Sequence, residues 1–141
     1  MIQNSVSIHK TSGAQDDLVL LRLSIPTDGD IIVELYSEND RLATFAHVLR
    51  EYKKRTDKSS CNFSFGTFDP TDAGGGVEFH LAKAGALSKL DIKFSNESEK
   101  GKTAPNKITA FVMPEPTEQF IIELDQLALF NTGTAIWKLQ G

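Results

Sequence analysis

The sequence predicts an α+β fold in a single domain, residues 1–141, built mostly from antiparallel β-sheet or a β-sandwich of seven to eight short strands. Over most of the chain apolar residues alternate with polar ones, as in half-buried strands. A helical period replaces this alternation in two segments, at about residues 40–54 and 117–130. Strict β–α–β alternation is missing, which argues against a doubly wound fold. We therefore expect two amphipathic helices that cover an open face or edge of the sheet.

The first third of the chain is predicted to form strands. Val6 and Ile8 alternate with serines, as in a strand with one buried face. A second segment, rich in aliphatic residues, covers residues 17–25, and a third covers residues 31–36. Turn-forming residues between these two segments predict a hairpin across residues 26–30.

The first helix is predicted from an apolar stripe at helical spacing. Asn39 or Asp40 can cap its first turn, and a basic cluster at its end suits the negative pole of the helix dipole. The members of the stripe are Leu42, Phe45, Ala46, Leu49 and Tyr52.

Further strands and the second helix fill the rest of the chain. Strands are predicted near residues 61–65, 77–81, 90–94, 108–113 and 135–139. The second helix opens at Pro116-Thr117 with Thr117 as its N-cap. The glycine run at residues 74–76 precedes a strand and not a helix, so it predicts a flexible hairpin loop rather than a phosphate cradle.

Composition and charge exclude several classes of protein. The single cysteine, Cys61, permits no internal disulfide, and the first residues lack a secretory signal, so we expect a cytoplasmic protein. No apolar run is long enough to span a membrane. The net charge of −4 argues against nucleic-acid binding. Residues 1–40 carry seven acidic side chains against two basic ones, which predicts either an acidic face for a basic partner or a solvated surface.

No recognisable catalytic, cofactor-binding or metal-binding motif is present. His9, His47 and His80 are scattered without the spacing of metal ligands. Cys61 shares a strand face with phenylalanines and is interpreted as a small buried apolar residue. A Gly-x-Ser-x-Gly nucleophile elbow is missing as well. We therefore predict no catalytic residue, no cofactor and no metal.

The order of elements over about residues 30–130 resembles that of the immunity proteins that bacteria carry against their own polymorphic toxins, notably in contact-dependent growth inhibition and wall-associated toxin systems. The similar segments are the helix Leu42-x-x-Phe45-x-x-x-Leu49, the strand Cys61-Asn62-Phe63-Ser64-Phe65, the strand pair Gly76-Val77-Glu78-Phe79 and Leu90-Asp91-Ile92-Lys93-Phe94, and the helix Glu118-Gln119-x-Ile121-x-x-Leu124-x-x-Leu127.

The resemblance implies a small inhibitor without enzymatic activity. It would bind one cognate toxin domain, basic and of nuclease type, in the producing cell and block its active site or substrate access. Such a protein would be a monomer or small homo-oligomer with no nucleic-acid or membrane partner. The toxin contacts predicted from the acidic turns are Phe68, Asp69 and Asp72, with Asp28 and Asp30 as second choices.

Two other functions stay open. The chain could be a small-molecule or carbohydrate-binding β-sandwich module that uses aromatic residues such as Phe68 and Trp137. It could also be an enzyme with an unrecognised site, for which His80, Glu78 and Asp72 are the first residues to inspect.

Overall fold

The computed structural model describes residues 4–15, 18–27, 29–55, 59–69, 74–96 and 106–140, with residues 12–15 described by their backbone alone. In this part of the chain the elements follow one another as β1 (Ser5–Gln15), β2 (Leu18–Ile25), β3 (Ile31–Glu38), α1 (Asp40–Lys54), β4 (Ser60–Gly66), β5 (Gly76–Ala84), β6 (Leu87–Ser95), β7 (Asn106–Val112), α2 (Pro114–Leu129) and β8 (Gly133–Lys138).

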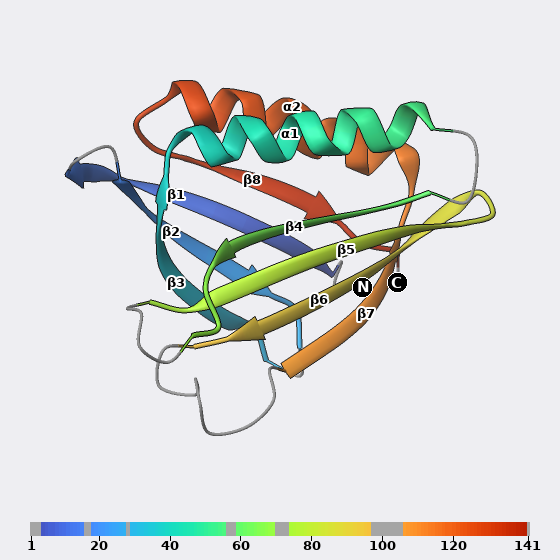
Figure 1. The fold of residues 1–141 in the computed structure, drawn as a ribbon, viewed down its shortest axis with the longest axis horizontal. Coiled ribbons are helices and arrows are strands. Elements are labelled where there is room, and N and C mark those ends of the chain that lie inside the picture. Colours follow the sequence, from blue (N-terminus) through green and yellow to red (C-terminus); the bar gives the residue numbers. More distant parts are fainter. Residues whose placement is uncertain are drawn as a thin grey trace.

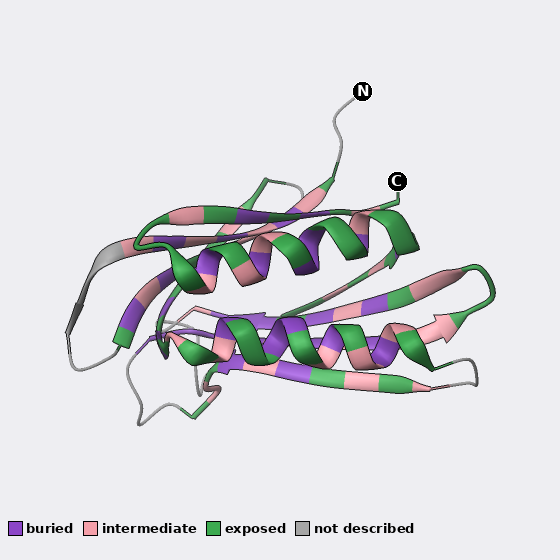
Figure 2. Ribbon diagram, turned by 90° about the horizontal axis from the view of Figure 1, so that it is seen from above, coloured by how far each residue is buried: buried purple, intermediate pink, exposed green. Residues whose placement is uncertain are grey.

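The strands form two four-stranded antiparallel sheets, which confirms the predicted α+β class. The first sheet has the order β3-β2-β1-β8, and the second has the order β4-β5-β6-β7. The helices lie side by side along one side of the two sheets, with α1 next to β4 and α2 next to β8 (Figure 1). Seen from above in Figure 2, the buried residues of each helix form a stripe, as the apolar periodicity requires.

Backbone hydrogen bonds also join the two sheets to each other. The Gly75 N–H donates to the Glu34 carbonyl at 2.9 Å, next to the start of β5. At the other junction the Gln140 N–H donates to the Phe111 carbonyl at 2.8 Å, so the chain beyond β8 pairs with β7. The two sheets and the helices therefore enclose one continuous apolar core.

The centre of this core is aromatic. Phe45 of α1 stacks on Phe63 of β4 with ring centroids 4.7 Å apart. Phe120 of α2 stacks on Trp137 of β8, also at 4.7 Å. Because each pair joins a helix to a sheet, ring packing fixes the helix layer on the strands.

The helix N-termini differ from the sequence prediction. α1 covers the predicted residues, but Asn39 makes no side-chain capping bond; its Nδ2 donates to the Ala128 carbonyl of α2 at 2.9 Å. α2 begins at Pro114, so the prediction of Thr117 as its N-cap is wrong. Proline is well tolerated in the first helical turn, where its missing N–H breaks no bond. This lets the helix start earlier than the cap-like threonine suggests.

The glycine run is also different from the prediction of a flexible loop. All three glycines are buried: Gly74 and Gly75 lie against β3, and Gly76 lies against the backbone of Thr67 and Phe68 after β4. A Cβ on Gly75 would collide with the Val33 side chain and lie 2.7 Å from the Ser95 carbonyl oxygen. Gly75 is therefore required for the close approach of the two sheets.

A buried lysine completes the C-terminal end of α2, which has no basic residue in its last turn. Lys10 of β1 is 4% exposed, and its Nζ donates to the carbonyls of Leu127 at 2.9 Å and Phe130 at 2.6 Å. Burial lowers the pKa of Lys10. The ammonium satisfies carbonyls that a helix leaves unpaired and opposes the negative pole of its dipole.

Candidate partner-binding surface

The outer side of the edge strand β3 combines acidic and large apolar side chains. Val33, Leu35 and Ser37 point into the core, so the intervening residues face outward. Among them Ile32 is 55% exposed and Tyr36 is 61% exposed. We call this surface, with the exposed acids that flank the strand, the β3 face; it consists of Asp30, Ile32, Glu34, Tyr36, Glu38 and Asp40.

The neighbouring strand β2 supplies one cation and further apolar area. Arg22 lies opposite Glu34, and its Nε is 3.1 Å from the Glu34 Oε2. Leu20 lies opposite Tyr36 and is half-buried. Arg22 and Glu34 are each about half exposed, so their ion pair contributes little to stability. It does neutralise the middle of the β3 face and leaves net negative charge at both ends.

The structure describes three of the five predicted contact residues, and they lie in different surroundings. Asp30 belongs to the β3 face. Phe68 is half-buried and Asp69 is exposed, and both follow β4 in a segment whose Asp69 N–H donates to Thr67 Oγ1 at 3.0 Å. The loops before β3 and after β4 both lie on the side away from the helices in Figure 1. Asp28 and Asp72 lie outside the described residues.

The acidic surplus of this region is evident from its composition, but the face that these acids share depends on their spacing along the strand. From Asp30 to Glu38 the even-numbered positions alternate between acid and apolar residue, while the odd positions supply Val33 and Leu35 to the core. A strand with period two therefore puts every second residue of this segment on one side. That signal was present in the sequence.

The outer side of the second sheet is polar instead. One row across the four strands contains Asn62, His80, Asp91 and Thr109, and the next row contains Ser64, Glu78, Lys93 and Lys107. His80 Nδ1 lies 2.5 Å from Asn62 Oδ1, and Thr109 Oγ1 donates to Asp91 Oδ1 at 2.5 Å. A hollow of about 270 Å³ lies over these rows, lined by Asn62, Glu78, His80, Asp91, Lys93 and Lys107.

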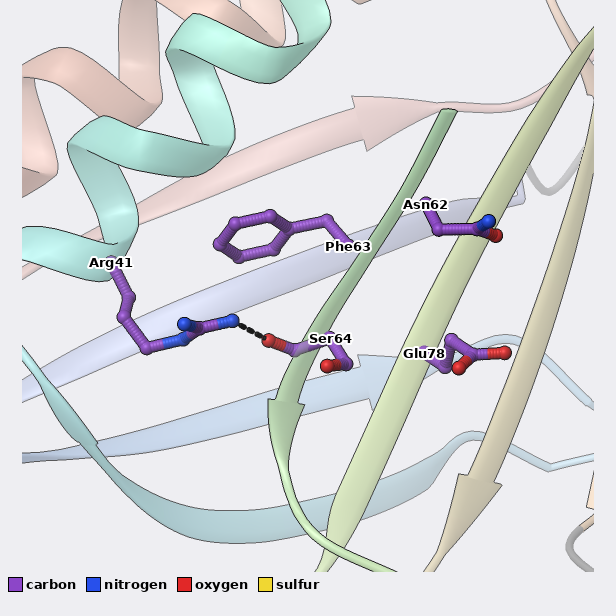
Figure 3. A pocket seen from close by; sticks show the side chains of 5 residues that line it. All are labelled: Arg41, Asn62, Phe63, Ser64 and Glu78. Carbon is purple, nitrogen blue, oxygen red and sulfur yellow. Dashed lines mark hydrogen bonds between the residues drawn. The ribbon is translucent and has the colours of Figure 1, made fainter. Parts of the chain in front are cut away.

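A second hollow, of about 200 Å³, adjoins the first, because Asn62 and Glu78 line both. Figure 3 shows Arg41 reaching from α1 toward β4, where it donates a hydrogen bond to the Ser64 carbonyl. Its guanidinium carbon lies 4.5 Å from the centre of the Phe63 ring. Arg41 thereby covers the rim of the aromatic core with a cation–π contact.

The structure also locates the residues named for the other functions. Trp137 is fully buried in the core, so the carbohydrate-binding alternative loses one of its two named aromatic residues. Glu78 and His80 line the same hollow, but their proposed companion Asp72 is not among the described residues. Within the described ranges, no three His, Cys, Asp or Glu side chains gather as metal ligands would.

Cys61 is half-buried and packs against the core, and burial raises the pKa of its thiol.

Neither helix in the described part of the chain is long and apolar enough to cross a membrane. No protein-family model, curated protein or solved structure matches this chain.

Proposed function

We propose that this domain binds a protein partner with a basic surface and acts as an immunity protein that neutralises a toxin domain. The observation that carries the proposal is the β3 face, where exposed Ile32 and Tyr36 alternate with the carboxylates of Asp30, Glu34 and Glu38. The resemblance of the sequence to toxin immunity proteins supports the same function.

The β3 face has the composition of a binding hot spot with a charged rim. Tyrosine is enriched among the residues that dominate binding energy, because its ring buries a large apolar area and its hydroxyl still forms hydrogen bonds. Tyr36 stands beside Leu20, and the ion pair of Arg22 and Glu34 separates it from Ile32. A partner that covers these residues gains apolar burial at two points along the strand.

The acids at the ends of the strand would speed association with a basic partner. Asp30 and Glu38 are exposed, and neither has an ion-pair partner among the described residues. Complementary charge of this kind raises association rates more than it raises affinity. A nuclease-type toxin holds its substrate phosphates with cations, so the carboxylates of the β3 face would occupy the same groove and exclude the substrate.

The outer side of the first sheet would extend such a contact beyond β3. Its outer side continues from β3 through the half-buried Leu20 to Ile136 on β8, which is 42% exposed. A protein–protein interface of standard size covers about 800 Å² on each partner. A partner centred on the exposed apolar residues of the β3 face would therefore also cover the adjoining strands.

Binding to the toxin domain encoded by the neighbouring gene tests the proposal. We expect nanomolar affinity for that domain and restored growth when both proteins are produced in one cell. Tyr36→Ala should weaken binding by about 2 kcal/mol, which is roughly thirtyfold in Kd. Glu38→Lys should slow association at low salt and have little effect at high salt.

Two further charge reversals locate the interface. Glu115→Lys changes the same charge on α2, away from β3, and should leave the association rate unchanged. Asp69→Lys tests the turn that the sequence favoured. If Asp69→Lys slows association and the β3 variants do not, the turn after β4 is the contact and the β3 face is not. If the protein binds no neighbouring toxin and protects no cell, the immunity function is wrong.

A further inference from the structure

The polar rows on the second sheet form a trough that crosses the strands. The two hollows described above share Asn62 and Glu78 and together extend from Arg41, at the start of α1, to Lys107 on β7. Neighbouring strands lie about 4.8 Å apart, so the trough measures about 14 Å from β4 to β7. A ligand with one or two rings would fit along it.

Charge is unequal along this trough. Lys93 and Lys107 are directly opposite each other in the β6–β7 pair, and both side chains are exposed. Like charges at such positions destabilise a sheet, because their Cβ atoms are only about 5 Å apart. Glu78 lies opposite Lys93 on the other side, but Lys107 has no acid in an ion pair with it among the described residues. An anion at the β6–β7 end would relieve this repulsion.

The rest of the trough offers hydrogen-bond acceptors for hydroxyl groups. Glu78 and Asp91 present carboxylates, and Asn62 presents an amide, all on the lining of the larger hollow. Asp91 is already positioned by the hydroxyl of Thr109, and Asn62 by His80. A carboxylate held by one protein donor still has free lone pairs for a ligand hydroxyl.

We propose that this trough binds a small hydroxylated anion, of the class of sugar phosphates and sugar acids. The anionic group lies between Lys93 and Lys107, and the hydroxyl groups donate to Glu78, Asp91 and Asn62. The larger hollow, at about 270 Å³, is just below the usual size of a ligand pocket, which suits a single sugar unit. This site is on the other sheet from the β3 face, so it does not depend on the proposed toxin contact.

Amide NMR titrations test the site with four probes: glucose phosphate, glucuronate, glucose and inorganic phosphate. We expect glucose phosphate, glucuronate or both to shift the amides of β5, β6 and β7, with dissociation constants at least tenfold below those of glucose and inorganic phosphate. The comparison of the two charged sugars shows which anionic group the lysines prefer.

Two variants and a control separate this role from a structural one. Lys107→Gln should weaken binding of the charged sugars at least tenfold, and Lys138→Gln, an exposed lysine on the outer side of β8, should not. Glu78→Gln should weaken the charged sugars, because it replaces a carboxylate acceptor of their hydroxyl groups by a weaker amide acceptor. Inorganic phosphate does not use this acceptor, and the loss of a negative charge favours an anion, so its binding should not weaken.

Three outcomes would overturn the proposal. The first is that neither charged sugar shifts these amides at millimolar concentration. The second is that inorganic phosphate binds as well as the sugars, which would make the lysines an unspecific anion site. The third is that Lys107→Gln binds the ligand like the unchanged protein, in which case Lys107 only protects the edge strand β7 from pairing with other chains.

Discussion

Replacement of Thr117 by valine tests how α2 is held on the first sheet. Thr117 is 4% exposed, and its Oγ1 accepts a hydrogen bond from Trp137 Nε1 at 3.0 Å while donating to the Met113 carbonyl at 2.9 Å. Valine has nearly the same shape but no hydroxyl. The change therefore removes both bonds with little change in packing.

The expected loss of stability depends on which hydrogen bonds Met113 and Trp137 keep after the substitution. The Met113 carbonyl still accepts the Thr117 N–H at 3.3 Å, so it stays paired. The indole N–H of Trp137 is in a fully buried side chain and loses its partner. An unsatisfied buried donor costs about 1–3 kcal/mol. For a chain of this length that corresponds to a fall of about 3 to 12 °C in Tm.

Thr44→Val is the matched control. Thr44 also donates to the carbonyl four residues before it, Asp40, but it is exposed and has no indole partner. The free energy of unfolding can be measured with denaturant from the fluorescence of Trp137, the single tryptophan. It should fall by about 1–3 kcal/mol in Thr117→Val and by less than about 0.5 kcal/mol in Thr44→Val.

The serine variant separates the hydroxyl from the methyl group. Thr117→Ser keeps the bond to the indole and should lose only about 1 kcal/mol for the missing methyl. The indole N–H resonance of Trp137 should keep its position in Thr117→Ser and move in Thr117→Val. If Thr117→Val and Thr44→Val unfold at the same denaturant concentration, the buried hydrogen bond between Thr117 and Trp137 does not stabilise the protein as argued.

Three further predictions concern glycine, cysteine and lysine. Gly75→Ala should cost about 1–3 kcal/mol or prevent folding, since its Cβ would meet β3, whereas Gly29→Ala, with open space around it, should be nearly neutral in the same unfolding assay. Cys61 should react with Ellman's reagent near neutral pH more slowly than in the unfolded chain, because burial raises its pKa and the thiolate is the reactive form. Lys10 has a lowered pKa, so between that value and the ordinary 10.5 the unfolded chain binds the proton that the folded chain has lost. The free energy of unfolding should therefore rise with pH through this window in the unchanged protein more than in Lys10→Met. If the two proteins show the same dependence of stability on pH, the pKa of Lys10 is not lowered in the folded chain.

The local pattern of the sequence predicted much of the fold. The helix over residues 40–54 and the α+β class are confirmed, because apolar periodicity alone distinguishes a helix from a strand and marks its buried face. The same pattern contained the β3 face, since the alternation from Asp30 to Glu38 fixes which side chains point outward. The charge count alone does not reveal this face, because a count does not say on which side of the strand each acid lies.

Tertiary structure decided what depends on contacts between distant segments. Lys10 meets the end of α2 across more than a hundred residues, and Lys93 meets Lys107 because of the register of β6 and β7. Gly75 is buried because β3 runs beside it, and Thr117 is a hydrogen-bond partner of Trp137 rather than a helix cap. Periodicity determines how a segment folds and which face it buries, but it contains no information on which segment will pack there. That choice depends on the order and twist of the strands, which only the folded chain sets.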